Sequence, residues 1–142
     1  MKHTALAHRQ HGAALLEALI SILLFSLGVL GIVALQAKAT QFSVDSEDRT
    51  RAALLANQIV SQMWAQQSTT LDAATLSSWK AQVSATSSGL PAGDGDVSLC
   101  IEVDLKNDCE ILGLATVTIS WKAPWRKSAE QANSYVTKVM IP

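Results

Sequence analysis

The chain has 142 residues, a length that suits one small folded domain with an accessory segment. It carries 11 basic and 12 acidic side chains, which gives a formal net charge of −1 at pH 7. This balance gives no support to a polyanion-binding protein, so a nucleic-acid-binding protein is disfavoured.

The first predicted element is an apolar helix over residues 13–35, AALLEALISILLFSLGVLGIVAL, in which Glu17 is the one charge. At 1.5 Å per residue it spans about 34 Å, enough to cross a hydrocarbon core of about 30 Å. Lys2 and Arg9 precede it and the sequence after it is slightly acidic, so the positive-inside tendency places the N-terminus in the cytoplasm. The stretch therefore predicts a single membrane pass.

Three kinds of N-terminal segment are compatible with this stretch. The first is a cleaved secretory signal, because Ala37-Lys38-Ala39 has the form of a signal peptidase site. The apolar run is longer than the roughly 7–15 residues usual in such signals. The second is a plain anchor, in which Glu17 would have to reach the interface, since a carboxylate inside a span costs about 2.5–3.5 kcal/mol. The third is cleavage after Gly12, which removes a short basic leader and keeps the helix.

The third interpretation gives Glu17 a function. A cut after Gly12 creates an α-amine at Ala13, and the amine and carboxylate of neighbouring copies would neutralise each other where neither is well solvated. On a helical wheel Glu17 shares an arc of about 140° with small residues. Small residues allow helices to approach closely in lipid. They are also common in membrane helices in general. The predicted packing face consists of Ala14, Glu17, Ala18, Ser21, Gly28 and Gly31.

The residues around Gly12 resemble the class III signal of type IV prepilins, with the run His11-Gly12-Ala13-Ala14-Leu15-Leu16-Glu17-Ala18-Leu19-Ile20. The continuation is similar to minor pilins of the PilV kind, with the run Ser26-Leu27-Gly28-Val29-Leu30-Gly31-Ile32-Val33-Ala34-Leu35-Gln36. The resemblance implies cleavage after Gly12 by prepilin peptidase and N-methylation of Ala13 by the same enzyme. It also implies that Glu17 contacts the N-terminal amine of a neighbouring subunit. The rest of the chain matches this family only in architecture.

The implied architecture is an α+β, pilin-like fold, in which a long transmembrane-to-amphipathic helix packs on a small antiparallel β-sheet. The implied domains are a cleaved leader (1–12), a transmembrane and assembly helix (13–35) and a globular domain (36–142). The globular domain would hold the amphipathic helix, a variable loop and the C-terminal sheet. The protein would be a single-pass inner-membrane protein with a periplasmic C-terminal domain, and later part of a pilus on the cell surface.

The implied function is that of a minor pilin, which enters a type IV pilus through its hydrophobic helix and primes assembly or lies near the tip. The implied partners are the membrane, prepilin peptidase, other minor pilins, the major pilin and the inner-membrane assembly platform. Two departures bear on this: the first mature residue is Ala13 where the family usually has Phe, and the helix lacks the Pro of major pilins. The alternatives are a type II secretion pseudopilin, a DNA-uptake pilin and a soluble secreted domain cut after Ala39.

After the apolar stretch the helix is predicted to continue to about residue 67, with room for a break near residues 43–46. Its apolar stripe, which needs a sheet to pack against, consists of Ala52, Leu55, Ile59 and Met63. The charged section before the stripe is predicted to be solvated and contains Asp45, Glu47, Asp48, Arg49 and Arg51. Trp64 is expected to help close the core.

Residues 68–96 are rich in Ser, Thr, Ala and Gly, and they predict a short helix over 73–83 followed by a loop. Alternation of apolar and polar residues then predicts strands over 97–105 and 115–122, with a shorter third strand over 135–141.

The two cysteines, Cys100 and Cys109, cannot form a metal site alone, and the three histidines all precede the apolar stretch. In an exported domain they predict a disulfide. Cys100 is predicted on the solvent face of its strand, with the loop 106–113 folding back over it. Such a bond would contribute about 2–3 kcal/mol to stability.

The sequence contains no catalytic constellation, so we predict neither an enzyme nor a bound cofactor or metal. Asp94-Gly95-Asp96 is interpreted as a turn rather than as part of a calcium loop. The run WKAPWRK at 121–127 interleaves basic residues with aromatic ones, a pattern that could bind single-stranded DNA by stacking and charge. However, Trp121 is in register with the buried face and Pro124 ends the strand, so DNA is disfavoured as a partner.

Overall fold

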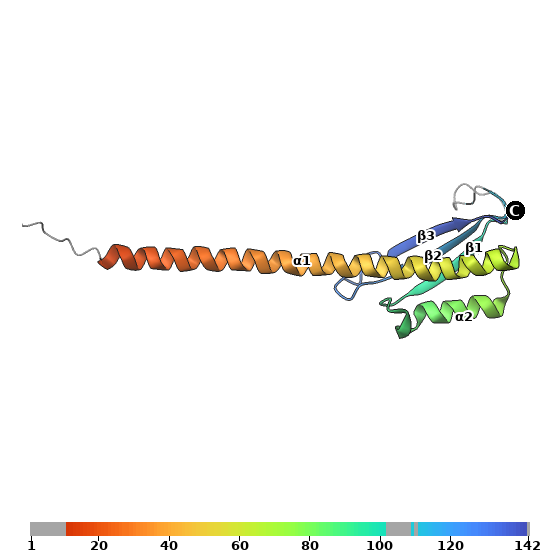
Figure 1. The fold of residues 1–142 in the computed structure, drawn as a ribbon, viewed down its shortest axis with the longest axis horizontal. Helices are drawn as coiled ribbons and strands as arrows, with labels where there is room; N and C mark the ends of the chain where they lie inside the picture. The colour runs from red at the N-terminus through yellow and green to blue at the C-terminus, as the bar shows by residue number, and fades with distance from the viewer. Residues whose placement is uncertain (1–10, 102–108, 110, 142) are drawn as a thin grey trace, which may run out of the picture. The chain divides into compact units, whose positions relative to one another are not determined.

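The structure is a computed structural model that describes residues 11–101, 109 and 111–141. Its helices are α1 (His11–Gln66), α2 (Ala73–Ser84) and the short 3-10 helix η1 (Thr86–Ser88). They are followed by strands β1 (Asp94–Leu99), β2 (Ala115–Trp121) and β3 (Asn133–Val139) (Figure 1). A long N-terminal helix and a small antiparallel sheet confirm the predicted α+β class. Contacts divide the chain into two units, Met1–Phe42 and Ser43–Pro142, and α1 contributes to both.

Helix α1 is continuous through residues 43–46, so the break that the sequence allowed is not formed. The reason is local: residues 32–66 contain neither proline nor glycine, the residues that most often interrupt helices. The hydroxyl of Thr50 donates to the carbonyl of Ser46 at 3.0 Å, a bond made within the helix.

The core of the second unit lies between α1 and the sheet. Ala52, Ile59 and Met63 are fully buried and Leu55 packs against them, which confirms the predicted stripe. On β2 the buried residues are Ala115, Val117, Ile119 and Trp121, so this strand alternates strictly between buried and half-buried positions, as expected.

The prediction for Trp64 is wrong, because its side chain is 46% exposed. It follows Met63 directly and therefore points about 100° away from the stripe. Trp79 and Trp121, which are 2% and 3% exposed, fill the core instead.

Helix α2 confirms the short helix predicted over 73–83. Asp72 caps it: Oδ2 accepts from the Thr75 amide at 2.9 Å and Oδ1 from the Thr75 hydroxyl at 2.6 Å. The side-chain and backbone bonds from Thr75 hold the pKa of Asp72 below its ordinary value of 3.8. The buried Trp79 donates its Nε1–H to the Leu55 carbonyl at 2.9 Å, which joins α2 to α1.

In the described residues the sheet has the strand order β1-β2-β3, and both pairs of neighbours are antiparallel. Val97 of β1 lies opposite Val117 of β2, and Ile119 of β2 lies opposite Tyr135 of β3. The second strand matches its prediction closely, whereas the third begins and ends two residues before the predicted range 135–141.

The first strand differs most from its prediction, because β1 covers residues 94–99 and not 97–105. The sequence Asp94-Gly95-Asp96 is therefore strand and not a turn. A Cβ atom at Gly95 would lie 2.8 Å from Cη2 of Trp79, so glycine is what allows the indole to cover the strand here. Ile101, an apolar position of the predicted strand 97–105, is 81% exposed, and residues 102–105 lie outside the described residues.

Candidate functional site

The first candidate site is the apolar part of α1. Among the described residues, this helix is the one long and apolar enough to cross a membrane. Its large apolar side chains are all exposed, from 41% for Val29 to 73% for Phe25. A surface of this size and composition is unstable in water, so it requires lipid or other apolar helices around it.

All six residues of the predicted packing face lie on this helix and are exposed: Ala14, Glu17, Ala18, Ser21, Gly28 and Gly31. Because α1 is unbroken over them, the wheel arc calculated from the sequence applies to the structure. A Cβ atom at Gly28 or Gly31 would meet no described atom within 4 Å. Packing among the described residues therefore does not require glycine at either position.

Polar side chains on the apolar helix bond to its own backbone. The hydroxyl of Ser26 donates to the Leu23 carbonyl at 2.8 Å, and the hydroxyl of Thr40 donates to the Gln36 carbonyl at 3.0 Å. Such bonds satisfy hydroxyl groups in an apolar medium. Glu17 differs from these hydroxyls because it carries a formal charge.

The predicted cleavage site lies at the start of the described chain. The backbone is helical at Gly12 and Ala13. Residues 1–10 of the predicted leader, with His3 and His8, lie outside the described residues, and the cleavage and methylation at this site stay predictions.

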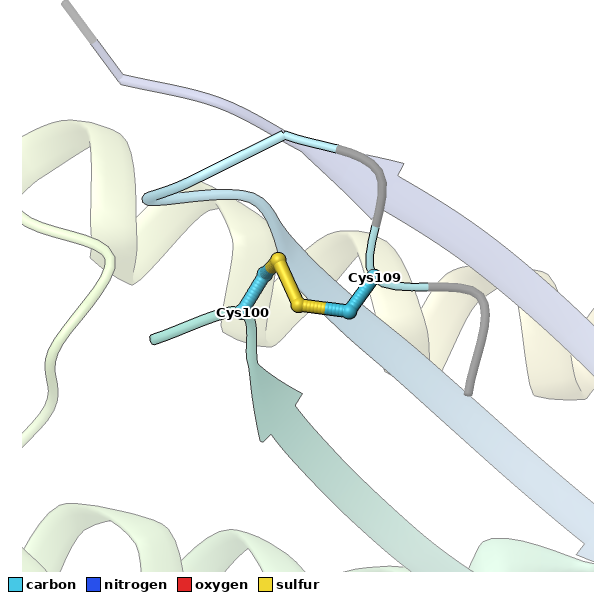
Figure 2. The surroundings of a disulfide bond; sticks show 2 residues. All are labelled: Cys100 and Cys109. Carbon is cyan, nitrogen blue, oxygen red and sulfur yellow. A yellow bond between two sulfur atoms is a disulfide. The ribbon is translucent and has the colours of Figure 1, made fainter. Parts of the chain in front are cut away.

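The second candidate site is the disulfide between Cys100 and Cys109, which confirms the predicted pairing. Figure 2 shows Cys100 just past the end of β1 and Cys109 in the loop that leads to β2. The Cys100 amide donates to the Leu114 carbonyl at 2.8 Å, and its carbonyl accepts from the Gly113 amide at 2.9 Å. The covalent bond and these two hydrogen bonds fix the end of the β1–β2 connection.

Cys100 was predicted on the solvent face of its strand, with the loop 106–113 folding back over it, and it is only 7% exposed. It lies one residue past the end of β1, where the disulfide and the hydrogen bonds to Gly113 and Leu114 join it to the β1–β2 connection.

The charged section of α1 holds a residue that sequence reasoning missed. Asp48, predicted to be solvated, is 2% exposed, and its Oδ2 has no hydrogen-bond partner among the described residues. Burial raises the pKa of this carboxyl above its ordinary 3.8, against the attraction of Arg51, and the charges of Asp45 and Glu47 raise it further. The signal was present in the spacing, because Asp48 precedes Ala52 and Ala56 at intervals of four and so lies on the buried stripe.

The residues considered for DNA contact are partly engaged in their own loop. Trp121 is buried, as predicted. The Lys122 ammonium donates to the Ser128 carbonyl at 2.7 Å, and the Arg126 guanidinium donates to the Gln131 carbonyl at 3.3 Å.

Among residues 11–101, 109 and 111–141, no group of three or more His, Cys, Asp or Glu side chains is placed to hold a metal ion. The comparisons with known proteins add no family: no protein-family model matches the chain, and no match is found among curated proteins or solved structures.

Proposed function

We propose that this protein is a minor pilin of a type IV pilus, which enters the filament through the apolar part of α1 and primes assembly or lies near the tip. The observation that carries the proposal is an exposed apolar helix with one carboxylate, Glu17, near its start. The resemblance of the sequence around Gly12 to prepilin signals indicates which assembly system the helix enters, namely the type IV pilus. The pilin-like fold and the periplasmic and pilus locations belong to the same proposal.

The proposed mechanism is physical. In lipid the helix gains little from apolar contacts with other helices, because the acyl chains are equally apolar. A carboxylate in the span costs about 2.5–3.5 kcal/mol unless a partner relieves it. Cleavage after Gly12 would supply that partner, since the new α-amine of a neighbouring subunit is the cation that Glu17 meets on leaving lipid. The charge then favours the filament over the free membrane protein and sets the axial register.

The small residues on the same arc allow the helix to leave lipid and pack against other helices. Gly28 and Gly31 have open space around Cα, so a neighbouring helix can approach their backbone closely. The face is then a contact surface for helices of the same class, which are the other minor pilins and the major pilin.

The test is the replacement Glu17→Ala in the chromosomal gene, followed by immunoblots of membranes and of sheared filaments. We expect normal cleavage and membrane levels, and at least about a ten-fold drop in the filament fraction, since ten-fold corresponds to only 1.4 kcal/mol. Glu130→Ala, an exposed acid in the second unit, is the matched control. Normal entry of the Glu17→Ala protein into filaments would contradict the proposal.

A second experiment distinguishes a type IV pilus from a type II secretion system. Deletion of the gene should abolish or reduce surface pili and leave enzyme secretion intact. Loss of secretion with normal pili would instead assign the protein to a type II secretion system as a pseudopilin.

A further inference from the structure

A surface pocket of about 440 Å³ lies beside Asp48 in the second unit. Its volume falls in the range of pockets that hold small ligands, roughly 300–1,000 Å³. The lining is largely apolar and uncharged, and comes from α1, the end of α2, the segment 86–92 and the turn after β2. It comprises Val44, Asp48, Arg51, Ser84, Thr86, Gly89, Leu90, Pro91, Ala92, Pro124 and Trp125.

Backbone bonds hold the walls of the pocket in place. The Lys122 amide donates to the Pro91 carbonyl at 2.9 Å, which joins the segment before β1 to the turn after β2. The Arg126 amide donates to the Ala123 carbonyl at 3.0 Å and closes the turn that contains Trp125. The indole of Trp125 is 42% exposed, so an aromatic surface is accessible at the pocket.

Asp48 is the unsatisfied group of this pocket. Its residue is 2% exposed, and Oδ2 meets no hydrogen-bond donor among the described residues. A buried polar atom without a partner costs about 1–3 kcal/mol, and more when it is charged. A group of this kind needs an explanation, and a donor in the pocket would supply one once the carboxylate, whose Oδ2 is closed to solvent, turns toward it.

Arg51, the cation that lines the same pocket, has two hydrogen-bond partners of its own. Arg51 donates through Nη1 to the Gly89 carbonyl at 2.8 Å and through Nη2 to Glu47 at 2.6 Å. The ion pair with Glu47 offsets the charge of Arg51, which attracts Asp48 but donates no hydrogen bond to its Oδ2. Among the described residues that line it, Asp48 and Arg51 are the charged ones.

We propose that this pocket binds a cationic side chain, arginine or lysine, presented by a peptide segment of another protein. The ammonium or guanidinium group donates to Asp48, and the face of Trp125 stacks against the same group, as cations do with indole rings. Leu90, Pro91 and Pro124 contact the aliphatic stem. The inference is independent of the proposed pilus function, because it concerns residues of the second unit alone.

The test is a titration of the full chain in detergent micelles with acetyl-Gly-Arg-Gly-amide, followed by NMR of the labelled indole groups. The matched ligand has citrulline in place of arginine, which keeps the shape and removes the charge. We expect a saturable shift of the Trp125 indole, with the arginine peptide binding at least about ten-fold more tightly than the citrulline peptide. Trp64, Trp79 and Trp121 should shift less, since none of them lines the pocket.

Two variants assign the effect to the carboxylate. Asp48→Asn should remove the preference for arginine, and Asp45→Asn, an acid that lines a neighbouring pocket, should preserve it. The proposal is overturned if the Trp125 indole shows no saturable shift up to about 20 mM peptide, a range that still detects very weak binding. It is equally overturned if both peptides bind alike, if Asp48→Asn leaves the preference intact, or if calcium chloride shifts the indole while the peptides do not.

Discussion

Removing the Cys100–Cys109 disulfide is expected to destabilise the second unit strongly. The two cysteines are nine residues apart in the sequence, so the bond closes a loop of about ten residues. In the chain-entropy model, closing such a loop lowers the entropy of the unfolded chain by about 9 cal/mol/K, which corresponds to about 2.7 kcal/mol of stability at 25 °C. For a unit of about 100 residues this corresponds to a fall in Tm of about 10–20 °C.

The assay is thermal unfolding of the full chain in micelles, followed by tryptophan fluorescence. All four tryptophans lie after residue 43, so the signal reports on the second unit and not on the apolar helix. The double variant Cys100→Ser/Cys109→Ser is compared with the oxidised protein. A reductant should lower the Tm of the oxidised protein to that of the variant and should leave the variant itself unchanged.

A fall in Tm of less than about 3 °C would refute this reasoning, because it would correspond to less than about 1 kcal/mol. The hydrogen bonds of Cys100 to Leu114 and Gly113 would then hold the β1–β2 connection without the covalent bond.

Two further predictions concern the second unit. Gly95→Ala should cost about 1–3 kcal/mol in urea unfolding, because the new Cβ would lie 2.8 Å from the Trp79 ring. An unchanged midpoint, equal to that of the exposed control Ser98→Ala, would contradict this. Asp48→Asn should raise the Tm at pH 7, because Asn resembles the protonated side chain that the fold favours. The pKa of Asp48 is raised in the folded protein, so the contribution of Asp48 to stability is complete below pH 3.8 and is lost as the pH rises through the folded pKa. The gain should vanish below pH 3.8, and a lower Tm at pH 7 would show that ionised Asp48 stabilises the fold.

The sequence predicted those elements in which a single periodicity dominates. Strand β2 alternates without exception, and the stripe around Ile59 repeats at helical spacing, so both were found from pattern alone. The Cys100–Cys109 pairing was also predictable, because the chain has two cysteines and a disulfide is what they form if the domain is exported.

The remaining features depend on contacts between distant segments. The start of β1 was missed because Asp94-Gly95-Asp96 has the composition of a turn, and only the position of Trp79 over Gly95 explains a glycine in the strand. Asp48 was assigned to solvent because its neighbours are charged, although its spacing to Ala52 continues the buried stripe. Local composition therefore outweighed periodicity in both predictions, and tertiary packing decided the outcome.

The most direct measurement of the central claim is mass spectrometry of the mature N-terminus of the protein purified from membranes. The proposal predicts a chain that begins at Ala13, so that the apolar helix and Glu17 are retained behind a new α-amine. A chain that begins at Thr40 would mean ordinary secretion without the helix, and an intact Met1 would mean a plain membrane anchor. Either of these results would contradict the claim that Glu17 is neutralised by the amine of a neighbouring subunit.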